Sequence, residues 1–277
     1  MWLIMSVFYP NAKINIGLRI IEKRNDGFHN LETLFVPYPL YDILEIIKSP
    51  DNNTHMFNYG KSYSLPSKNH EKELCIQAFR LLEKDYTLTP VHIGLYKNIP
   101  IGAGLGGGSA DAAFTLKALN QIFNLRLSCE KLCEYAAILG SDVPFFIYNE
   151  PMFARGKGDI FSSIDNISNK HPFILQTLSP DSLYEIRLIT PKIHISTKEA
   201  YDIIDLHRNN LEYSEKLEKL LENSITDWKN LIKNDFENII FSNHPELAKI
   251  KKDFYDNGAL YASMSGSGSS VYGIFKK

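Results

Sequence analysis

The chain has 277 residues, of which 44% are hydrophobic and 22% charged, proportions that are typical of a folded globular protein and exclude a disordered or fibrous one. Its 32 acidic and 30 basic residues leave a net charge of −2, so it lacks the basic excess of a nucleic-acid-binding protein. The length favours two domains, since domains cluster near ~100 to 150 residues.

The cysteines and the N-terminal residues indicate the cellular compartment. Cys75, Cys129 and Cys133 form an odd set without a CxxC pair, which disfavours both a disulfide framework and a zinc site. The start MWLIMSVFYPN lacks the features of a signal peptide, and no run of about 18 apolar residues follows. We therefore expect a cytoplasmic protein that is neither exported nor embedded in a membrane.

The first third of the chain is predicted to be mostly sheet. Residues 8–20 alternate between apolar and polar side chains, which predicts a half-buried strand with Lys13 and Asn15 on its polar face. Further strands are predicted over residues 33–38 and 43–47. A helix over residues 71–84 and a strand over residues 91–96 follow, and they are predicted from apolar spacing and strand-like composition.

The rest of the chain mixes helices and strands, so the fold class is predicted as α+β. Helices are expected over residues 110–124 and 128–139, the second with Ser128 as its N-cap. A polar stretch near residues 160–170 suggests a boundary between a first domain, 1–160, and a second, 161–277. The second domain is predicted to hold strands at 173–178, 184–189, 260–264 and 271–275, and several helices between 198 and 256.

A glycine-rich segment, PIGAGLGGGSADAA at residues 100–113, is directly followed by a helix-forming run. Unpaired N–H groups at a helix N-terminus attract anions, and glycine lets the backbone approach them closely. The segment therefore predicts a phosphate-binding loop, within which Ser109 could cap the helix or contact a phosphate or Mg²⁺. The loop residues predicted to bind are Pro100, Ile101, Gly102, Ala103, Gly104, Leu105, Gly106, Gly107, Gly108, Ser109 and Ala110. We expect Gly107→Val to abolish nucleotide binding and to leave the fold intact.

Other nucleotide-binding motifs fit this loop poorly. Gly102, Gly104 and Gly107 satisfy GxGxxG, but a second helix follows where a dinucleotide site needs a strand with an acidic residue. A Walker loop would place a lysine beside the serine, and the VAIK, HRD and DFG motifs of protein kinases are missing. A flexible linker is disfavoured because an apolar strand and an alanine-rich helix bracket the glycines.

Four segments together resemble the GHMP kinases: PNAKINIGLRIIEKRNDGFHNLETLF, GLGGGSADAA, GSDVPFF and MSGSGSSVYGIF. The resemblance implies a ribosomal-S5-like ATP domain followed by a ferredoxin-like C-terminal domain, and an ATP-dependent small-molecule kinase. It further implies that the substrate is a cytidyl diphosphate sugar alcohol, phosphorylated on the 2-hydroxyl of its methylerythritol unit in non-mevalonate isoprenoid biosynthesis. Two alternatives stay open, a kinase of the same family acting on homoserine, mevalonate or a sugar, and a nucleotide-binding module without turnover.

The resemblance also implies roles for individual residues. Asp142 would accept the proton of the substrate hydroxyl and Lys13 would orient that hydroxyl, although an aspartate at this point of GSDVPFF could instead be a plain helix N-cap. No spacing of histidine, cysteine and acidic residues indicates a transition-metal site, so we expect any metal to be Mg²⁺ that arrives with ATP.

The resemblance places the cytidine on a set of aromatic and polar side chains. Phe28 would stack on the cytosine and His29 would hydrogen-bond its edge, unless both simply pack under a hairpin turn. Thr197 and Tyr201, which are four residues apart and hence on one helical face, would complete the clamp. Asn15 is predicted to bind substrate beside Lys13. The small-residue segment 264–269 is expected near the phosphates, or is a tight turn.

Overall fold

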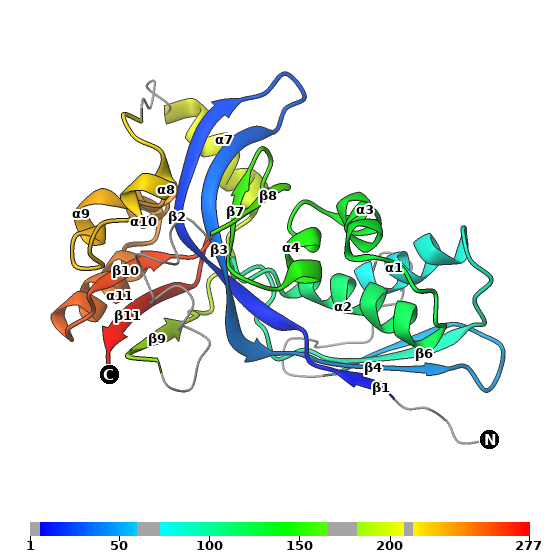
Figure 1. Ribbon diagram of the computed structural model, residues 1–277. Helices are drawn as coiled ribbons and strands as arrows, with labels where there is room; N and C mark the ends of the chain where they lie inside the picture. Colours follow the sequence, from blue (N-terminus) through cyan, green and yellow to red (C-terminus); the bar gives the residue numbers. More distant parts are fainter. Residues whose placement is uncertain (1–5, 60–72, 165–181, 208–212) are drawn as a thin grey trace. The chain divides into compact units, whose positions relative to one another are not determined.

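The structure is a computed structural model that describes residues 6–59, 73–164, 182–207 and 213–277 (Figure 1). The chain divides into two compact units. The first comprises residues 1–12, 39–101 and 106–150, and the second comprises residues 13–38, 102–105 and 151–277. Each unit thus collects segments from distant parts of the chain, and the division at residue 160 stays a prediction.

The first unit is a four-stranded sheet with helices on one face (Figure 1). Its strands, in spatial order, are β1 (Ser6–Phe8), β4 (Ile43–Lys48), β6 (Val91–Tyr96) and β5 (His55–Tyr59). Its helices are α1 (Leu74–Glu83), α2 (Gly107–Ile122), α3 (Cys129–Leu139) and α4 (Val143–Tyr148). The pairing of β5 with β6 is parallel, as the helical crossover through α1 requires, and the other two pairs are antiparallel.

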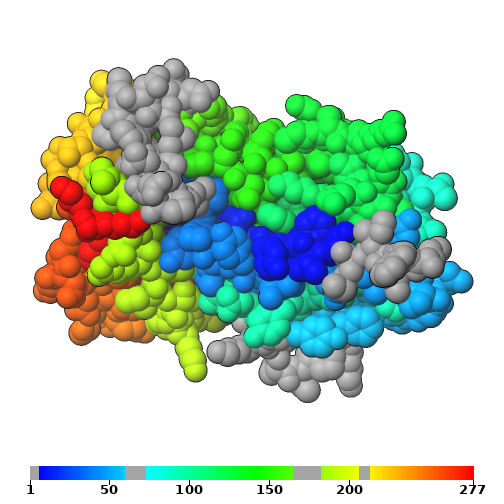
Figure 2. All heavy atoms as spheres, turned by 60° about the horizontal axis from the view of Figure 1, so that its bottom comes forward, coloured from blue at the N-terminus to red at the C-terminus, as the bar shows by residue number. Residues whose placement is uncertain are grey.

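The two faces of this sheet differ in what they bury. Alternate residues such as Leu44, Ile46 and Ile93 are fully buried on the side where α2 packs against β1 and β4. The opposite face is turned toward the viewer in Figure 2, where β1 is dark blue. Its strands expose large apolar side chains there, including Val7, Ile43, Phe57, Tyr59 and Tyr96.

The second unit contains two antiparallel sheets. One has the order β2 (Asn11–Lys23), β3 (His29–Tyr41), β7 (Met152–Arg155) and β8 (Ile160–Ser163), and the other has the order β10 (Tyr261–Met264), β11 (Val271–Lys276) and β9 (Tyr184–Ile189). Its helices are α7 (Thr197–His207), α8 (Leu217–Leu220), α9 (Trp228–Leu231), α10 (Glu237–Asn243) and α11 (Pro245–Asp256). Buried side chains of β2, the helices and the last two strands form its core, among them Leu18, Ile20, Phe236, Leu247 and Val271.

Most of the predicted elements are confirmed, including the α+β class and the strands at 91–96 and 184–189. The hydroxyl of Ser128 caps α3 by accepting a hydrogen bond from the Lys131 N–H at 3.2 Å. The predicted strand at 173–178 lies outside the described residues. Across the described ranges, no helix has the length and hydrophobicity to cross a membrane, and the three cysteines are free thiols.

Two local predictions are wrong. Strand β2 is not half-buried, because every residue from Asn11 to Ile20 is buried and its polar side chains are covered as well as its apolar ones. Helix α2 begins at Gly107, with Gly106 in the N-cap position at a φ of 70°, so Ser109 lies in the first turn and does not cap the helix. A left-handed φ at this point favours glycine, which explains why the helix can begin inside the glycine run.

Candidate active site

A polar network surrounds Lys13 on the inner part of β2. The Lys13 ammonium donates a hydrogen bond to Asn15 Oδ1 at 2.6 Å and lies 4.6 Å from the centroid of the Phe35 ring. Asn15 Nδ2 in turn donates to Thr33 Oγ1 at 3.0 Å. Lys13 is only 4% exposed, so it is not a solvated strand lysine. A buried ammonium is costly unless it has partners, and Asn15 Oδ1 is one of them.

The small-residue loop at 264–269 packs against the first part of the glycine loop. Ser265 Oγ donates to the Gly104 carbonyl at 2.9 Å and accepts from the Asn15 N–H at 3.3 Å. A Cβ atom on Gly104, where φ is 75°, would lie 2.1 Å from the Ser265 carbonyl oxygen. Only glycine can therefore occupy this position. The structure thus brings together three predicted segments, around Asn15, Gly104 and Ser265.

Asn234, which sequence reasoning missed, holds the same small-residue loop. This asparagine is 3% exposed, and its Nδ2 donates to the carbonyls of Met264 at 2.9 Å and Gly266 at 2.8 Å. Its Oδ1 accepts from the Phe236 N–H at 3.0 Å. No local motif reveals that this asparagine holds the loop, because the two carbonyls to which it donates lie 30 residues or more away along the chain.

The start of α2 offers backbone donors to an anion. The first helical hydrogen bond runs from the Ala110 N–H to the Gly106 carbonyl at 2.9 Å, so the N–H groups before it have no partner within the helix. No side chain caps this end. The N–H groups of Gly107, Gly108 and Ser109, together with the helix dipole, form an electropositive end that suits phosphate.

The structure corrects the expected effect of Gly107→Val. A Cβ atom on Gly107 would lie 2.9 Å from Ile99 Cγ2 and 3.1 Å from the Lys97 ammonium, so the substitution would disturb the interior and not only a phosphate path. Gly108 differs, since its Cβ would meet only Leu74 Cδ1 at an ordinary 3.7 Å. Among the other predicted loop residues, three have buried side chains and could contact a ligand only through their backbone: Ala103, Leu105 and Ala110.

A buried cluster of charges that sequence reasoning missed lies beneath the start of α2. The Lys97 ammonium donates to Asp111 Oδ2 at 2.6 Å and also to Asp42 Oδ2, and all three residues are at most 3% exposed. Asp42 Oδ1 accepts from the N–H groups of Asn98 at 2.6 Å and Ile99 at 2.8 Å. The cluster therefore ties the residue between β3 and β4, the residues directly after β6 and the second turn of α2 into one arrangement.

The charges of this cluster are unbalanced, since one ammonium faces two carboxylates. Burial, together with the neighbouring Asp42 carboxylate, raises the pKa of Asp111 to about 7, although the Lys97 ammonium opposes the shift. Burial lowers the pKa of Lys97, but the two carboxylates outweigh it and raise that pKa overall. Asp111 Oδ1 is buried without a hydrogen-bond partner, so no donor stabilises negative charge on that oxygen.

Asp142 occupies the N-cap position of α4 but does not act as a cap. Its backbone is helical, with φ −81° and ψ −14°, and its side chain makes no capping hydrogen bond. The interpretation as a plain helix cap therefore lacks support. Asp142 belongs to the first unit and Lys13 to the second, and their joint role stays a prediction.

His29 and Tyr201, two of the predicted clamp residues, lie in direct contact. Their rings stack with centroids 4.7 Å apart and an interplanar angle of 17°. Phe236 packs against Tyr201 in a T-shaped arrangement, with their ring centroids 5.0 Å apart. His29 is 6% exposed, so its ring is packed inside the protein. Phe28 beside it is 55% exposed and is therefore not buried under the hairpin.

The remaining clamp residue, Thr197, hydrogen-bonds to the small-residue loop through Ser267 Oγ at 3.0 Å. One turn beyond Tyr201, the same face of α7 presents Asp205, which sequence reasoning missed. Its Oδ1 lies 2.7 Å from His29 Nε2, and its Oδ2 accepts from Lys23 at 2.5 Å. Partial burial raises the pKa of Asp205, but these two hydrogen bonds outweigh it and lower that pKa overall. The spacing of Thr197, Tyr201 and Asp205, every fourth residue, is the signal that could have found it.

Comparison with known proteins identifies the family of the chain. Residues 73–150 match the family model for the GHMP kinases N terminal domain, and residues 216–277 match that for the GHMP kinases C terminal domain. The chain is 47% identical over 269 residues to 4-diphosphocytidyl-2-C-methyl-D-erythritol kinase of Bacteroides fragilis strain YCH46, covering 97% of this chain and 92% of the relative. It is 44% identical to the protein of the same name from Cytophaga hutchinsonii, with the same coverage.

Solved structures extend the likeness to three dimensions. The crystal structure of a 4-(cytidine 5'-diphospho)-2C-methyl-D-erythritol kinase matches with a TM-score of 0.75 at 28% identity, covering 97% of this chain and 89% of that chain. A mevalonate kinase from Methanococcus jannaschii matches with a TM-score of 0.67 at 15% identity over 98% of this chain and 90% of that chain, which indicates a shared fold only. With both domain models matched and relatives this similar over nearly their whole length, the chain belongs to the GHMP kinase family.

Proposed function

We propose that this chain transfers the γ-phosphoryl group of ATP to the 2-hydroxyl of 4-diphosphocytidyl-2-C-methyl-D-erythritol, a step of non-mevalonate isoprenoid biosynthesis. The observation that carries the proposal is the 47% identity, over 97% of the chain, to a curated kinase that bears the name of this substrate. The stacked pair of His29 and Tyr201 supports it, because the acceptors homoserine, mevalonate and galactose carry no nucleobase, whereas the cytidyl substrate does.

ATP is proposed to bind through its phosphates at the start of α2. The uncapped N–H groups of Gly107, Gly108 and Ser109 suit phosphate oxygens, and the half-exposed first turn leaves room for them. Mg²⁺ would arrive with ATP and neutralise phosphate charge, and the Ser109 hydroxyl is the oxygen of this turn that we propose to reach it. The Lys97, Asp42 and Asp111 cluster would hold the turn in place.

The proton of the substrate hydroxyl is proposed to pass to Asp142. Phosphoryl transfer needs positioning and charge stabilisation more than covalent help, so a carboxylate that accepts the proton and an ammonium that orients the hydroxyl are sufficient. Lys13, held by Asn15 and Phe35, is proposed as that ammonium.

The cytosine is proposed to be recognised by the second unit. Phe28 is 55% exposed, and the Lys157 ammonium lies 4.9 Å from the centroid of its ring, so the rest of the ring is proposed to stack on the base. His29 is fixed by Tyr201 and Asp205 and is proposed to present its remaining edge to the base. Thr197 extends the same helical face. The cytosine and the phosphates of ATP would thus be bound by different residues. Binding of the cytosine, which is remote from the reaction, would then position the hydroxyl that reacts.

An ADP-release assay tests the proposal. The purified chain would be given ATP, Mg²⁺ and one acceptor at a time: the cytidyl substrate, homoserine, mevalonate or galactose. We expect ADP release only with the cytidyl substrate. Release with another acceptor and not with this one would replace the proposed substrate, and release with none would favour a nucleotide-binding module without turnover.

A further inference from the structure

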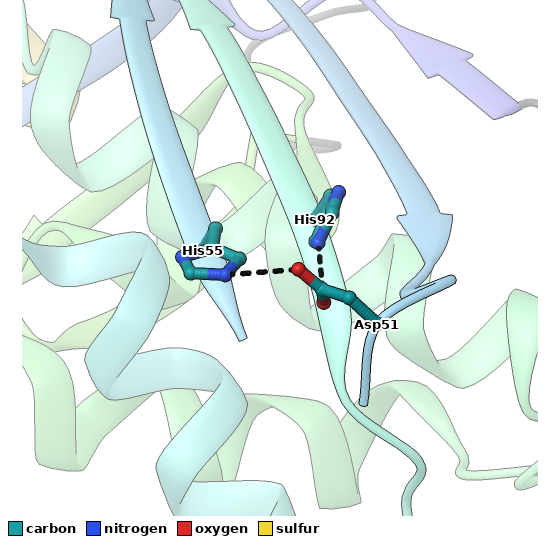
Figure 3. Close-up of side chains that lie close together, drawn as sticks. All are labelled: Asp51, His55 and His92. Atoms are coloured by element: carbon teal, nitrogen blue, oxygen red, sulfur yellow. Dashed lines mark hydrogen bonds and ion pairs between the residues drawn. The ribbon is translucent and has the colours of Figure 1, made fainter. Parts of the chain in front are cut away.

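Two histidines and an aspartate converge at one end of the sheet in the first unit, in residues that the proposed kinase reaction does not use (Figure 3). His55 begins β5 and His92 lies on β6, and the two are direct partners in the parallel register. Their side chains therefore stand on the same face of the sheet, with ring centroids 5.1 Å apart. Asp51 reaches them from the turn between β4 and β5.

The donor atoms of these residues are spaced as metal ligands are. Asp51 Oδ1 lies 3.1 Å from His92 Nε2, and Asp51 Oδ2 lies 3.3 Å from His55 Nε2. One donor atom from each residue can be chosen so that all three lie within 4.8 Å of one another. Two ligands at ~2.0 to 2.1 Å from a tetrahedral zinc ion are about 3.3 Å apart, so the observed spacing needs little change to close on an ion.

Neighbouring groups hold the aspartate in place. Ser49 Oγ donates to Asp51 Oδ1 at 2.6 Å and lies 3.2 Å from His92 Nε2. The Asn53 N–H also donates to Asp51 Oδ1, at 3.1 Å. The turn itself is tied to the segment before β6, because the Ser49 N–H donates to the Pro90 carbonyl at 2.8 Å. Such outer partners orient the ligands of metal sites.

We propose that Asp51, His55 and His92 bind a divalent transition-metal ion, for which Zn²⁺ fits best. Imidazole and carboxylate ligands suit zinc, and three protein ligands leave a fourth position for water. The side chains of Asp51 and His55 are 50% and 46% exposed, so an ion can enter from solvent. The ion would join edge strand β5 to β6 and to the preceding turn, and would stabilise this end of the sheet.

Calorimetric titration of the chelator-treated, full-length protein with Zn²⁺ tests this site. Cys129 is exposed and Cys133 is half-buried, so the titrations use a Cys129→Ser, Cys133→Ser background that removes competing thiols. We expect one Zn²⁺ per chain at this site, with a rise in Tm on binding. His55→Gln and His92→Gln should each weaken that binding at least roughly ten-fold, and Ser49→Ala by about 10- to 100-fold, the usual effect of losing an outer partner.

His244→Gln is the matched control, because His244 also faces a carboxylate, that of Glu246 at 3.7 Å, but without a second histidine. It should leave both affinity and the Tm rise unchanged. The proposal is overturned if the parent protein binds no Zn²⁺, or if affinity in His55→Gln and His92→Gln equals that of the parent. Circular dichroism spectra of the variants establish that each is folded, and a folded variant that keeps full affinity contradicts the site.

Discussion

His29 Nε2 and Asp205 Oδ1 lie 2.7 Å apart, although 176 residues separate them in the sequence. The contact links the first residue of β3 to α7 and fixes the imidazole that is proposed to meet the cytosine. A hydrogen bond to a charged group is worth ~1.5 to 3 kcal/mol, so its loss should cost roughly ten-fold or more in substrate binding.

We therefore expect Asp205→Ala to raise the KM for the cytidyl substrate roughly ten-fold while it changes kcat less. Asp202→Ala is the matched control, since Asp202 is an exposed acid on the same helix. Steady-state kinetics of both variants measure the effect. Equal KM values for the two variants would mean that Asp205 only supports the fold.

Gly108→Asp should separate the stability of the phosphate loop from its binding. The Cβ atom of the new side chain would meet only Leu74, at an ordinary distance, and a negative charge in the first turn of a helix is favourable, so Tm should be maintained or raised. The same charge should repel phosphate and greatly weaken the affinity for a non-hydrolysable ATP analogue in calorimetric titration.

Gly108→Ala is the control for this experiment, because it adds a methyl group without charge. It should bind the analogue more tightly than Gly108→Asp does. Undiminished affinity in Gly108→Asp would place the phosphates away from the start of α2. Gly107→Val, by contrast, should lower Tm, because its side chain would collide with Ile99 and Lys97.

The buried Asp111 should make stability depend on pH. Its folded-state pKa of about 7 lies above the ordinary value of 3.8, so the folded protein binds more protons than the unfolded chain between these values. The stabilisation is therefore present at low pH and is lost as the pH rises through about 7. Lys97 and Asp42 are the charged groups that face this carboxyl group.

Asp111→Asn should remove that loss. The free energy of unfolding of the variant minus that of the parent should be larger at about pH 7.5 than at about pH 4.5. Urea denaturation of both proteins at the two pH values measures this difference. Asp202→Asn, an exposed substitution, should show no such trend. If the difference between Asp111→Asn and the parent does not change with pH, then Asp111 titrates normally.

Asp142→Asn keeps the shape of the side chain but removes the proton acceptor. We expect kcat to fall roughly 10²- to 10⁴-fold, the usual range for a general base, with substrate affinity and Tm nearly unchanged. Glu150→Gln, an exposed acid shortly after the same helix, should leave kcat unaltered. A folded Asp142→Asn protein with near-normal turnover would assign Asp142 a structural role.

The sequence predicts this fold well where one local pattern decides the structure. The pattern of apolar residues predicts both ends of β6 and β9 correctly, and Ser128 correctly predicts where α3 begins. It predicts β2 poorly, because alternation says which residues share a face but not that both faces will be covered. The polar face of that strand, with Lys13 and Asn15, is buried by segments far away in the chain.

The same limit applies to the sites. The glycine loop, and the likeness that suggests Lys13 and Asp142, are visible in contiguous segments. No contiguous segment reveals the roles of Asp205, Asn234 and His92, because each of them bonds to a residue at least 30 positions away in the sequence. The expectation that no transition-metal site exists rests on spacing along the chain, and strand pairing brings His55 and His92 together in spite of it.

The most direct test of the proposed function compares two acceptors that share the reacting hydroxyl. One is the cytidyl substrate, and the other is 2-C-methyl-D-erythritol 4-phosphate, which lacks the cytidyl group. Stacking is worth ~1 to 3 kcal/mol per base, so kcat/KM should favour the cytidyl substrate by roughly 5- to 150-fold in the same ADP-release assay. Equal kcat/KM values for the two acceptors would contradict recognition of the base by Phe28, His29 and Tyr201, and with it the proposed substrate.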